Sequence, residues 1–157
     1  MEVYKKQKII VVPAQTNIFP SGKQIFFLFS LSQIEEIIKE IKIYQVPFSP
    51  KYIDGIANWQ GNIIPVLSLE KCLGLSQDKK EQDMRFMLIK VFISQENIKR
   101  CFLKISSSVQ MLSLPSFCAP VSNVNWLIRK NIVRGVYLWD KGYFIISEFK
   151  SILEGEL

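Results

Sequence analysis

Residues 47–69, PFSPKYIDGIANWQGNIIPVLSL, constrain the possible folds of this chain more than any other segment. Ser49 is a favourable N-cap, and Pro50 suits a first helical turn because its missing N–H would have no partner there. Gly55 can end such a helix in a left-handed conformation. The segment therefore predicts a short helix over residues 50–55.

The second half of this segment predicts a strand and then another helix. Residues 62–67 form an apolar run typical of a buried strand, Ser68 can cap a helix, and Gly74 can end it. Helix, turn, strand and helix in this order carry almost no catalytic chemistry. They do build a defined surface.

The chain has 157 residues, enough for one domain with its own core or for two small lobes that share one. Apolar residues make up 48% and charged residues 22%, so we expect a folded protein. The formal net charge of +6 raises the alternative of nucleic-acid binding. However, the 20 basic residues are scattered along the chain, which favours an ordinary solvated surface over a binding footprint.

Residues that could carry chemistry are scarce. The sequence has no histidine, and Cys72, Cys101 and Cys118 are widely spaced among apolar neighbours, which predicts reduced, buried thiols in a cytoplasmic protein. Without a glycine-rich phosphate loop or paired carboxylates framed by glycine turns, we expect no enzyme and no bound metal or cofactor. A lysine or cysteine nucleophile stays open, but no neighbour at suitable spacing would activate it.

Two segments bear on a membrane location. Residues 1–8 are polar and basic, with no apolar run of signal-peptide shape behind them. Residues 105–128 carry no charge, but six serines, two asparagines and two prolines make them too polar and too broken for a spanning helix. We expect a soluble, cytoplasmic chain.

Strand signals open the chain. Residues 8–12 and 24–31 are rich in Ile, Val and Phe and flank a turn-forming stretch, which predicts a strand–loop–strand pair. Isoleucines then recur at helical spacing over residues 34–41, and Ser32 precedes Glu35 by three as in a capping box. We therefore expect a short helix there.

Further strands are expected along the rest of the chain. A strand over residues 43–46 should follow the helix, and the polar run 76–83 is the candidate connector between two halves. Residues 84–94 and 99–106 predict a hairpin. Residues 132–149 predict two strands, with a short helix at their end.

A weak internal sequence repeat supports a two-lobed architecture. Its two copies are Ile53-Asp54-Gly55-Ile56 with Trp59 and Gly61, and Val133-Arg134-Gly135-Val136 with Trp139 and Gly142, each followed by an apolar run. The spacing differs by one residue at the turn. Short strands with regular turn signals predict a mainly β architecture of small barrels with little helix.

Taken together and in order, these segments resemble the CheW-like family of bacterial chemotaxis coupling proteins. The resemblance is carried by residues 34–37, 50–56, 58–66, 101–106, 133–136 and 145–149. It therefore covers nearly the whole chain. It implies a mainly β fold of two packed five-stranded SH3-like β-barrels with a few short helices. These would form a single domain over residues 1–157, with sub-barrels that divide near residues 76–83.

The resemblance also implies a function. Such a protein is a non-catalytic cytoplasmic adaptor that couples chemoreceptor cytoplasmic tips to the regulatory domain of a chemotaxis histidine kinase, in chemotaxis or surface motility. The kinase-facing surface would use apolar strand residues of one barrel. The receptor-facing residues implied by the family motif are Glu36, Asp54, Gly55, Asn58, Trp59, Gln60 and Gly61.

The sequence departs from the family at one informative position. The usual Asn-Leu-Arg-Gly is Asn58-Trp59-Gln60-Gly61 here. The neutral amide of Gln60 therefore replaces an arginine guanidinium, which can bind a carboxylate with two hydrogen bonds. Ser68 and Ser106 likewise stand at or near positions that are usually acidic. The resemblance thus implies a divergent member that needs a receptor altered to match.

The motif residues also have ordinary structural explanations. Gly55 and Gly61 suit turns with positive φ, and Glu36 is as well explained by solvation as by a basic partner group. Trp59 could pack in the core or anchor an interface.

The alternative function, a basic SH3-like barrel that binds nucleic acid, predicts steep salt dependence and basic side chains on one face. The adaptor predicts weak salt dependence and an exposed apolar patch near Trp59.

Overall fold

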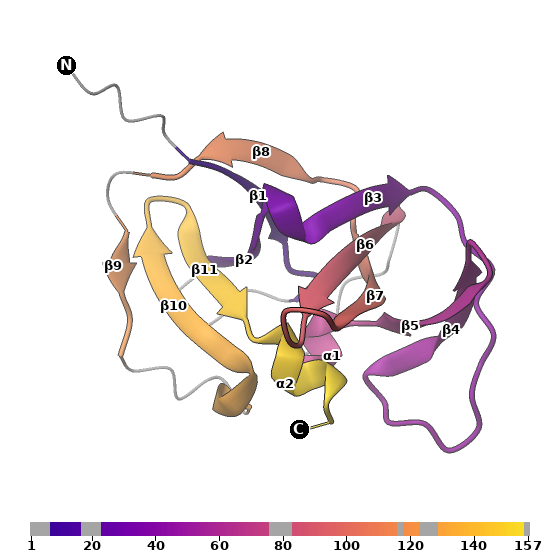
Figure 1. The fold of residues 1–157 in the computed structure, drawn as a ribbon. Coiled ribbons are helices and arrows are strands. Elements are labelled where there is room, and N and C mark those ends of the chain that lie inside the picture. The colour runs from indigo at the N-terminus through magenta and orange to yellow at the C-terminus, as the bar shows by residue number, and fades with distance from the viewer. Residues whose placement is uncertain (1–6, 17–22, 76–82, 116–117, 123–128, 156–157) are drawn as a thin grey trace.

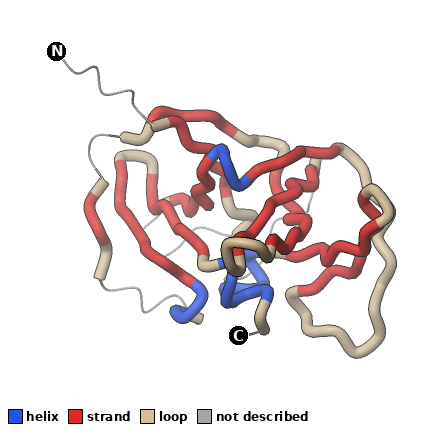
Figure 2. The backbone as a smooth tube through the Cα atoms, in the orientation of Figure 1, coloured by secondary structure: helices blue, strands red, loops and turns tan. Residues whose placement is uncertain are grey.

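The computed structural model describes residues 7–16, 23–75, 83–115, 118–122 and 129–155. Within these residues the strands form two sheets, each curved into a small barrel, with two short α-helices between them (Figures 1 and 2). The predicted mainly β architecture is confirmed, although one sheet has a short sixth strand.

The six-stranded sheet has the order β8-β1-β2-β11-β10-β9, and we call it the first barrel. Its strands are β1 (Lys8–Pro13), β2 (Gln24–Ser30), β8 (Gln110–Ser113), β9 (Ala119–Pro120), β10 (Val133–Trp139) and β11 (Gly142–Ser147). The second barrel has the order β3-β6-β7-β5-β4. Its strands are β3 (Ile34–Ile38), β4 (Ile53–Trp59), β5 (Asn62–Leu67), β6 (Met84–Phe92) and β7 (Ile98–Ser106). The helices are η1 (Leu31–Gln33), α1 (Leu69–Leu73), η2 (Lys130–Ile132) and α2 (Phe149–Leu153).

The first barrel joins both ends of the chain, and the second is built from its middle. β2 pairs in parallel with β11, so residues more than 100 positions apart share one sheet. β4 and β5 precede the predicted connector and β6 and β7 follow it, yet all four lie in the second barrel. Residues 76–82 of that connector lie outside the described residues. The chain passes between the barrels after β2 and again after β7.

The central strands are buried on both faces. In β1, Ile10 and Val12 face a core that both barrels and both α-helices share, whereas Ile9 and Val11 face the interior of the first barrel. β7 divides its side chains in the same way between the shared core and the interior of the second barrel. Two-sided burial explains why these strands read as continuous apolar runs.

Both barrels close by the same device. The chain that leaves the edge strand β3 crosses to the opposite edge, where the Tyr44 N–H donates to the Ile56 carbonyl at 2.8 Å. The chain that leaves β8 does likewise, and the Val121 N–H donates to the Val136 carbonyl at 2.9 Å. Each barrel therefore keeps little unpaired sheet edge.

The internal sequence repeat is confirmed as a structural repeat. The unit β4–β5–α1 recurs as β10–β11–α2 at a constant offset of 80 residues, from Ile53 to Val133 and from Leu73 to Leu153. A β-bulge opens each unit. The difference of one residue at the turn concerns the spacing from the tryptophan to the glycine, and the two hairpins have the same length. Only the glycine moves, because Gly61 lies in the first turn and Gly142 begins β11.

Two predicted helices are wrong. Residues 51–52 form a turn and β4 begins at Ile53, so Gly55 lies within a strand. The isoleucines of residues 34–38 form β3, paired with β6, because β-branched side chains fit a strand whenever a partner strand is available.

The remaining local predictions in this region have mixed outcomes. The capping interaction belongs to η1, where the Ser30 N–H donates to Gln33 Oε1 at 3.0 Å. The strand expected over residues 43–46 is a single bridge at Tyr44. By contrast, α1 follows Ser68 and ends at Gly74, whose φ is +73°, as predicted.

Candidate functional site

A tight turn presents the motif residues at one end of the second barrel. Gln60 and Gly61 join β4 to β5 with φ values of +50° and +82°, the two positive angles that a type I′ hairpin turn requires. The Asn58 side-chain oxygen accepts a hydrogen bond from the Gly61 N–H at 3.0 Å. Gln60 is exposed, so its amide is available to a partner.

Four side chains from three strands meet beside this turn, and we call them the Trp59 cluster: Glu35, Glu36, Trp59 and Arg100. Trp59 Nε1 donates to Glu36 Oε2 at 3.2 Å. The Arg100 guanidinium lies over the Trp59 ring, 5.6 Å from its centroid. Arg100 Nε donates to both carboxylate oxygens of Glu35, at 3.0 and 3.1 Å.

The curvature of the barrel brings the cluster together. β3 and β4 are opposite edges of the sheet, so only a closed barrel can place Glu36 beside Trp59. A bulge in β3 between Ile34 and Glu36 re-aims the side chains of the strand, and neighbouring Glu35 and Glu36 reach different partners in one cluster.

Trp59 combines a core contact with an exposed edge. Its ring packs against the interior of the second barrel but is only partly buried, and its indole N–H is bonded at the surface. Its repeat equivalent, Trp139, is 8% exposed and stacks on Phe144 inside the first barrel, with ring centroids 4.2 Å apart. The same fold position is thus core in one barrel and partly exposed in the other, where it can contact a partner.

Asp54 and Gly55 lie at the other end of β4, away from the Trp59 cluster. Asp54 forms an ion pair with Lys71 of α1 at 3.0 Å. Gly55 is buried with φ +152°, and a Cβ there would lie 2.4 Å from the Tyr44 carbonyl oxygen. The structure therefore brings five of the predicted site residues together. Asp54 and Gly55 lie apart from them and make local structural contacts.

Sequence reasoning missed Arg100 and did not select Glu35. Arg100 lies 65 positions from Glu35 and belongs to no motif, so nothing local in the sequence points to it. It supplies a cation beside the turn in which Gln60 replaces the usual arginine. The side chains of Arg100 and Glu35 are 36% and 19% exposed, so a partner can reach them.

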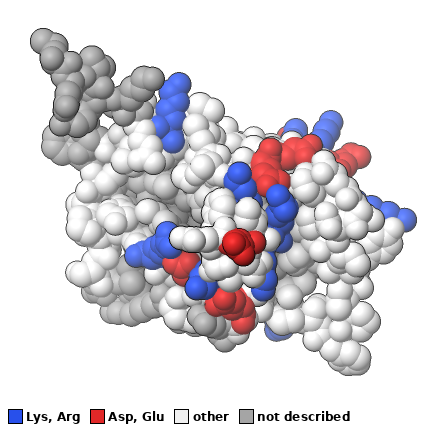
Figure 3. Space-filling view, viewed as in Figure 1, with Lys and Arg blue, Asp and Glu red and all other residues white. Residues whose placement is uncertain are grey.

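The charged side chains on this face are mixed in sign. Figure 3 shows acidic and basic residues interspersed over the middle of the molecule, with no continuous basic patch. Large apolar side chains are also exposed on the second barrel, among them Tyr44, Ile63 and Phe48, whose φ is +62°. Exposed apolar groups of this kind favour contact with another protein.

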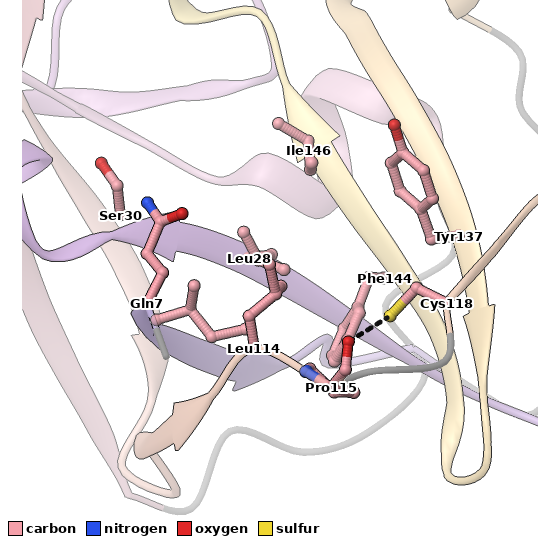
Figure 4. A pocket seen from close by; sticks show the side chains of 10 residues that line it. Gln7, Leu28, Ser30, Leu114, Pro115, Cys118, Tyr137, Phe144 and Ile146 are labelled. Carbon is pink, nitrogen blue, oxygen red and sulfur yellow. Dashed lines mark hydrogen bonds between the residues drawn. The ribbon is translucent and has the colours of Figure 1, made fainter. Parts of the chain in front are cut away.

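The first barrel contains an apolar cavity of about 470 Å³. Figure 4 shows Leu28 and Leu114 on one side of it, with Phe144, Tyr137 and Cys118 on the other. The Cys118 thiol lies 4.0 Å from the Pro115 carbonyl oxygen. The lining offers apolar contacts but no pair of groups suited to acid–base catalysis.

The three cysteines are free thiols. Burial raises the pKa of Cys72 to about 12 and raises the pKa of Cys101 as well, so both stay protonated and inert. Cys118 is half-buried, and burial raises its pKa too. Among the described residues, no three or more potential ligand side chains gather as a metal site would need.

No helix formed by the described residues is long and apolar enough to cross a membrane.

Comparison with known proteins gives one consistent family. The CheW-like domain matches residues 15–98 of this chain. The chain is 33% identical over 64 residues to the chemotaxis protein CheW of Helicobacter pylori, and 39% identical over 61 residues to that of Thermotoga maritima. These alignments cover 41% and 39% of this chain, and 39% of each relative.

Two further likenesses extend over more of the chain. It is 25% identical over 127 residues to chemotaxis protein CheV3 of Helicobacter pylori, which covers 80% of this chain and 40% of that protein. The scaffolding protein TtCheW from Thermoanaerobacter tengcongensis shares the fold, with a TM-score of 0.68 and 21% identity over 92% of this chain and 86% of that chain. Because the domain match spans more than half of the 157 residues, this protein belongs to the CheW-like family.

Proposed function

We propose that this protein is a non-catalytic cytoplasmic adaptor that couples chemoreceptor tips to the regulatory domain of a chemotaxis histidine kinase. Membership of the CheW-like family carries the proposal. The partly exposed Trp59 cluster supports it, because an aromatic ring flanked by a guanidinium and two carboxylates is typical of a protein interface.

The receptor-facing surface in this proposal is the Trp59 cluster with the Gln60-Gly61 turn. Trp59 would be the apolar anchor, and Arg100 would supply the cation that Gln60 lacks. Arg100 donates to Glu35 from Nε, and its two Nη groups are the donors with which it would bind a partner carboxylate. The kinase-facing surface would use exposed apolar residues of the second barrel, such as Ile63 and Phe48.

The nucleic-acid alternative has weaker support. It needs basic side chains gathered on one face, whereas on the face that Figure 3 shows acidic groups interrupt the basic ones. The chemotaxis proteins named above that resemble this chain give it no support. Salt separates the two proposals, since phosphate contacts weaken steeply with added salt.

A capture experiment tests the adaptor. The purified protein is presented with its host's chemoreceptor cytoplasmic fragment and kinase regulatory domain, at low and high salt. Contacts of about 1,200 Å² or less should give affinities near micromolar. We expect Trp59→Ala to weaken receptor binding by roughly tenfold or more and to leave kinase binding unchanged.

A matched pair of variants tests the altered motif. Gln60→Arg should change receptor affinity, while Gln110→Arg makes the same exchange at an exposed position on the first barrel and should not. Circular dichroism would confirm that each variant is folded. Equal receptor binding by wild type and Trp59→Ala would overturn the proposed surface.

A further inference from the structure

A polar pocket lies between the two barrels, outside the Trp59 cluster. It has a volume of about 180 Å³ and takes its lining from η1, β6, β10, β11, α2 and Glu148. Lys90 comes from the second barrel, and Arg134, Ser147 and Lys150 come from the first barrel and its helix. Its size suits the end of one charged side chain.

Ser147 is the unusual residue in this pocket. It is 7% exposed, and within the described residues its hydroxyl has no hydrogen-bond partner. A buried hydroxyl without a partner is unfavourable, and native structures contain few of them. Because Ser147 lines the pocket, a ligand there can supply the missing acceptor.

The internal repeat indicates that the fold does not require this hydroxyl. The position equivalent to Ser147 in the β4–β5 unit is Leu67, which is 2% exposed and packs in the shared core. An apolar side chain therefore satisfies the same strand position in the other copy. The serine is better explained by what the pocket binds than by what the barrel needs.

The other polar groups define what that ligand is. The Glu148 carboxylate also lines the pocket, and it accepts a hydrogen bond from Arg134, so these two opposite charges offset each other. Lys90 and Lys150 also line the pocket and take part in none of the ion pairs among the described residues, so its lining has more basic than acidic side chains. A hydroxyl and two ammonium groups are hydrogen-bond donors that suit a carboxylate.

We propose that this inter-barrel pocket receives an acidic side chain of the chemoreceptor, an inference that rests on the adaptor function proposed above. Lys90 pairs directly with Arg100 across β6 and β7, so the pocket continues the surface that begins at the Trp59 cluster. The receptor contacts Trp59 at one end of this surface and inserts an Asp or Glu carboxylate beside Ser147 at the other.

A small carboxylate tests the pocket without the receptor. Sodium acetate is titrated against sodium chloride of equal ionic strength, and backbone amide shifts are followed by NMR. We expect saturable shifts at Lys90 and Ser147 that weaken at least threefold in Ser147→Ala and in Lys90→Gln. The exposed control Lys8→Gln should match wild type. Shifts that are absent, do not saturate or are the same in all variants would overturn the pocket.

Receptor binding tests the partner. Ser147→Ala and Lys90→Gln should each lower affinity for the receptor fragment about tenfold, as expected for loss of a charge-assisted hydrogen bond. Ser147→Ala should leave the thermal midpoint unchanged or raise it, because it removes an unpartnered hydroxyl. Receptor binding that neither variant alters contradicts the inference alone. A wild-type protein that binds acetate but no receptor contradicts the adaptor function.

Discussion

At the scale of single residues, Gly55 shows how one backbone position controls barrel closure. Its φ of +152° and the 2.4 Å approach of the Tyr44 carbonyl to a Cβ leave no room for a side chain. We expect Gly55→Ala to lower the free energy of unfolding by roughly 2–3 kcal/mol, because it strains the backbone and pushes the closing segment away from β4. Urea denaturation measures this change.

Gly61 is the matched control for that variant. Its φ is +82°, but no heavy atom lies within 4 Å of a Cβ built on it. Gly61→Ala therefore carries the backbone strain without the collision and should cost about 1 kcal/mol. If both variants lose the same stability, the close approach to Tyr44 does not control closure.

At the scale of elements, the two hairpins of the repeat differ in their turns. Gln60 takes φ +50°, an unfavourable angle for a long side chain, whereas Asp140 and Lys141 in the second hairpin have no positive φ. Type I′ turns favour Asn-Gly. We expect Gln60→Asn to raise the free energy of unfolding by about 0.5 kcal/mol, which thermal denaturation measures.

The equivalent exchange in the other hairpin is the control. Asp140→Asn lies at the first position of a turn without positive φ, so it should leave stability unchanged. A similar gain in both hairpins, or a loss at Gln60, would show that backbone conformation does not limit the first turn. A gain in stability for Gln60→Asn alone would show that the wild-type chain has a residue less suited to this turn. Such a residue is expected where a position serves binding.

The same scale shows what the sequence could predict. Hairpins with clear turns and two-sided apolar strands, such as β6 with β7, were predictable from local pattern. β3 was not, because the isoleucines of residues 34–38 follow a helical period, and the strand forms through pairing with β6 and a bulge between Ile34 and Glu36. The prediction that Gly55 ends a helix failed for a related reason. What restricts this position is the carbonyl oxygen of Tyr44, eleven residues earlier in the chain.

At the scale of the whole molecule, function depends on contacts that join distant segments. The motif made Glu36 and Trp59 predictable as site residues, but Arg100 reaches them only after two barrel edges meet. The pocket beside Ser147 likewise needs both barrels in place. Sequence pattern identifies the motif, and the packing of one barrel on the other completes the surface around it.

Glu70 of α1 links the two barrels directly. It is 3% exposed, and its carboxylate accepts hydrogen bonds from the Gln15 N–H beyond β1 at 2.9 Å and from the Ser68 hydroxyl at 3.3 Å. Glu70→Ala removes the acceptor for the Gln15 N–H at the junction between the barrels. We expect this variant to lose about 2–3 kcal/mol of unfolding free energy.

Glu70→Gln separates the hydrogen bond from the rest of the side chain, because its amide oxygen can still accept from Gln15. It should lose less than half of what Glu70→Ala loses, as measured by urea denaturation. Hydrogen exchange should show that Glu70→Ala speeds opening of β1 and α1 together, since one contact holds both. Equal losses in the two variants, or faster exchange in α1 alone, would mean that the shared apolar core joins the barrels without help from this carboxylate.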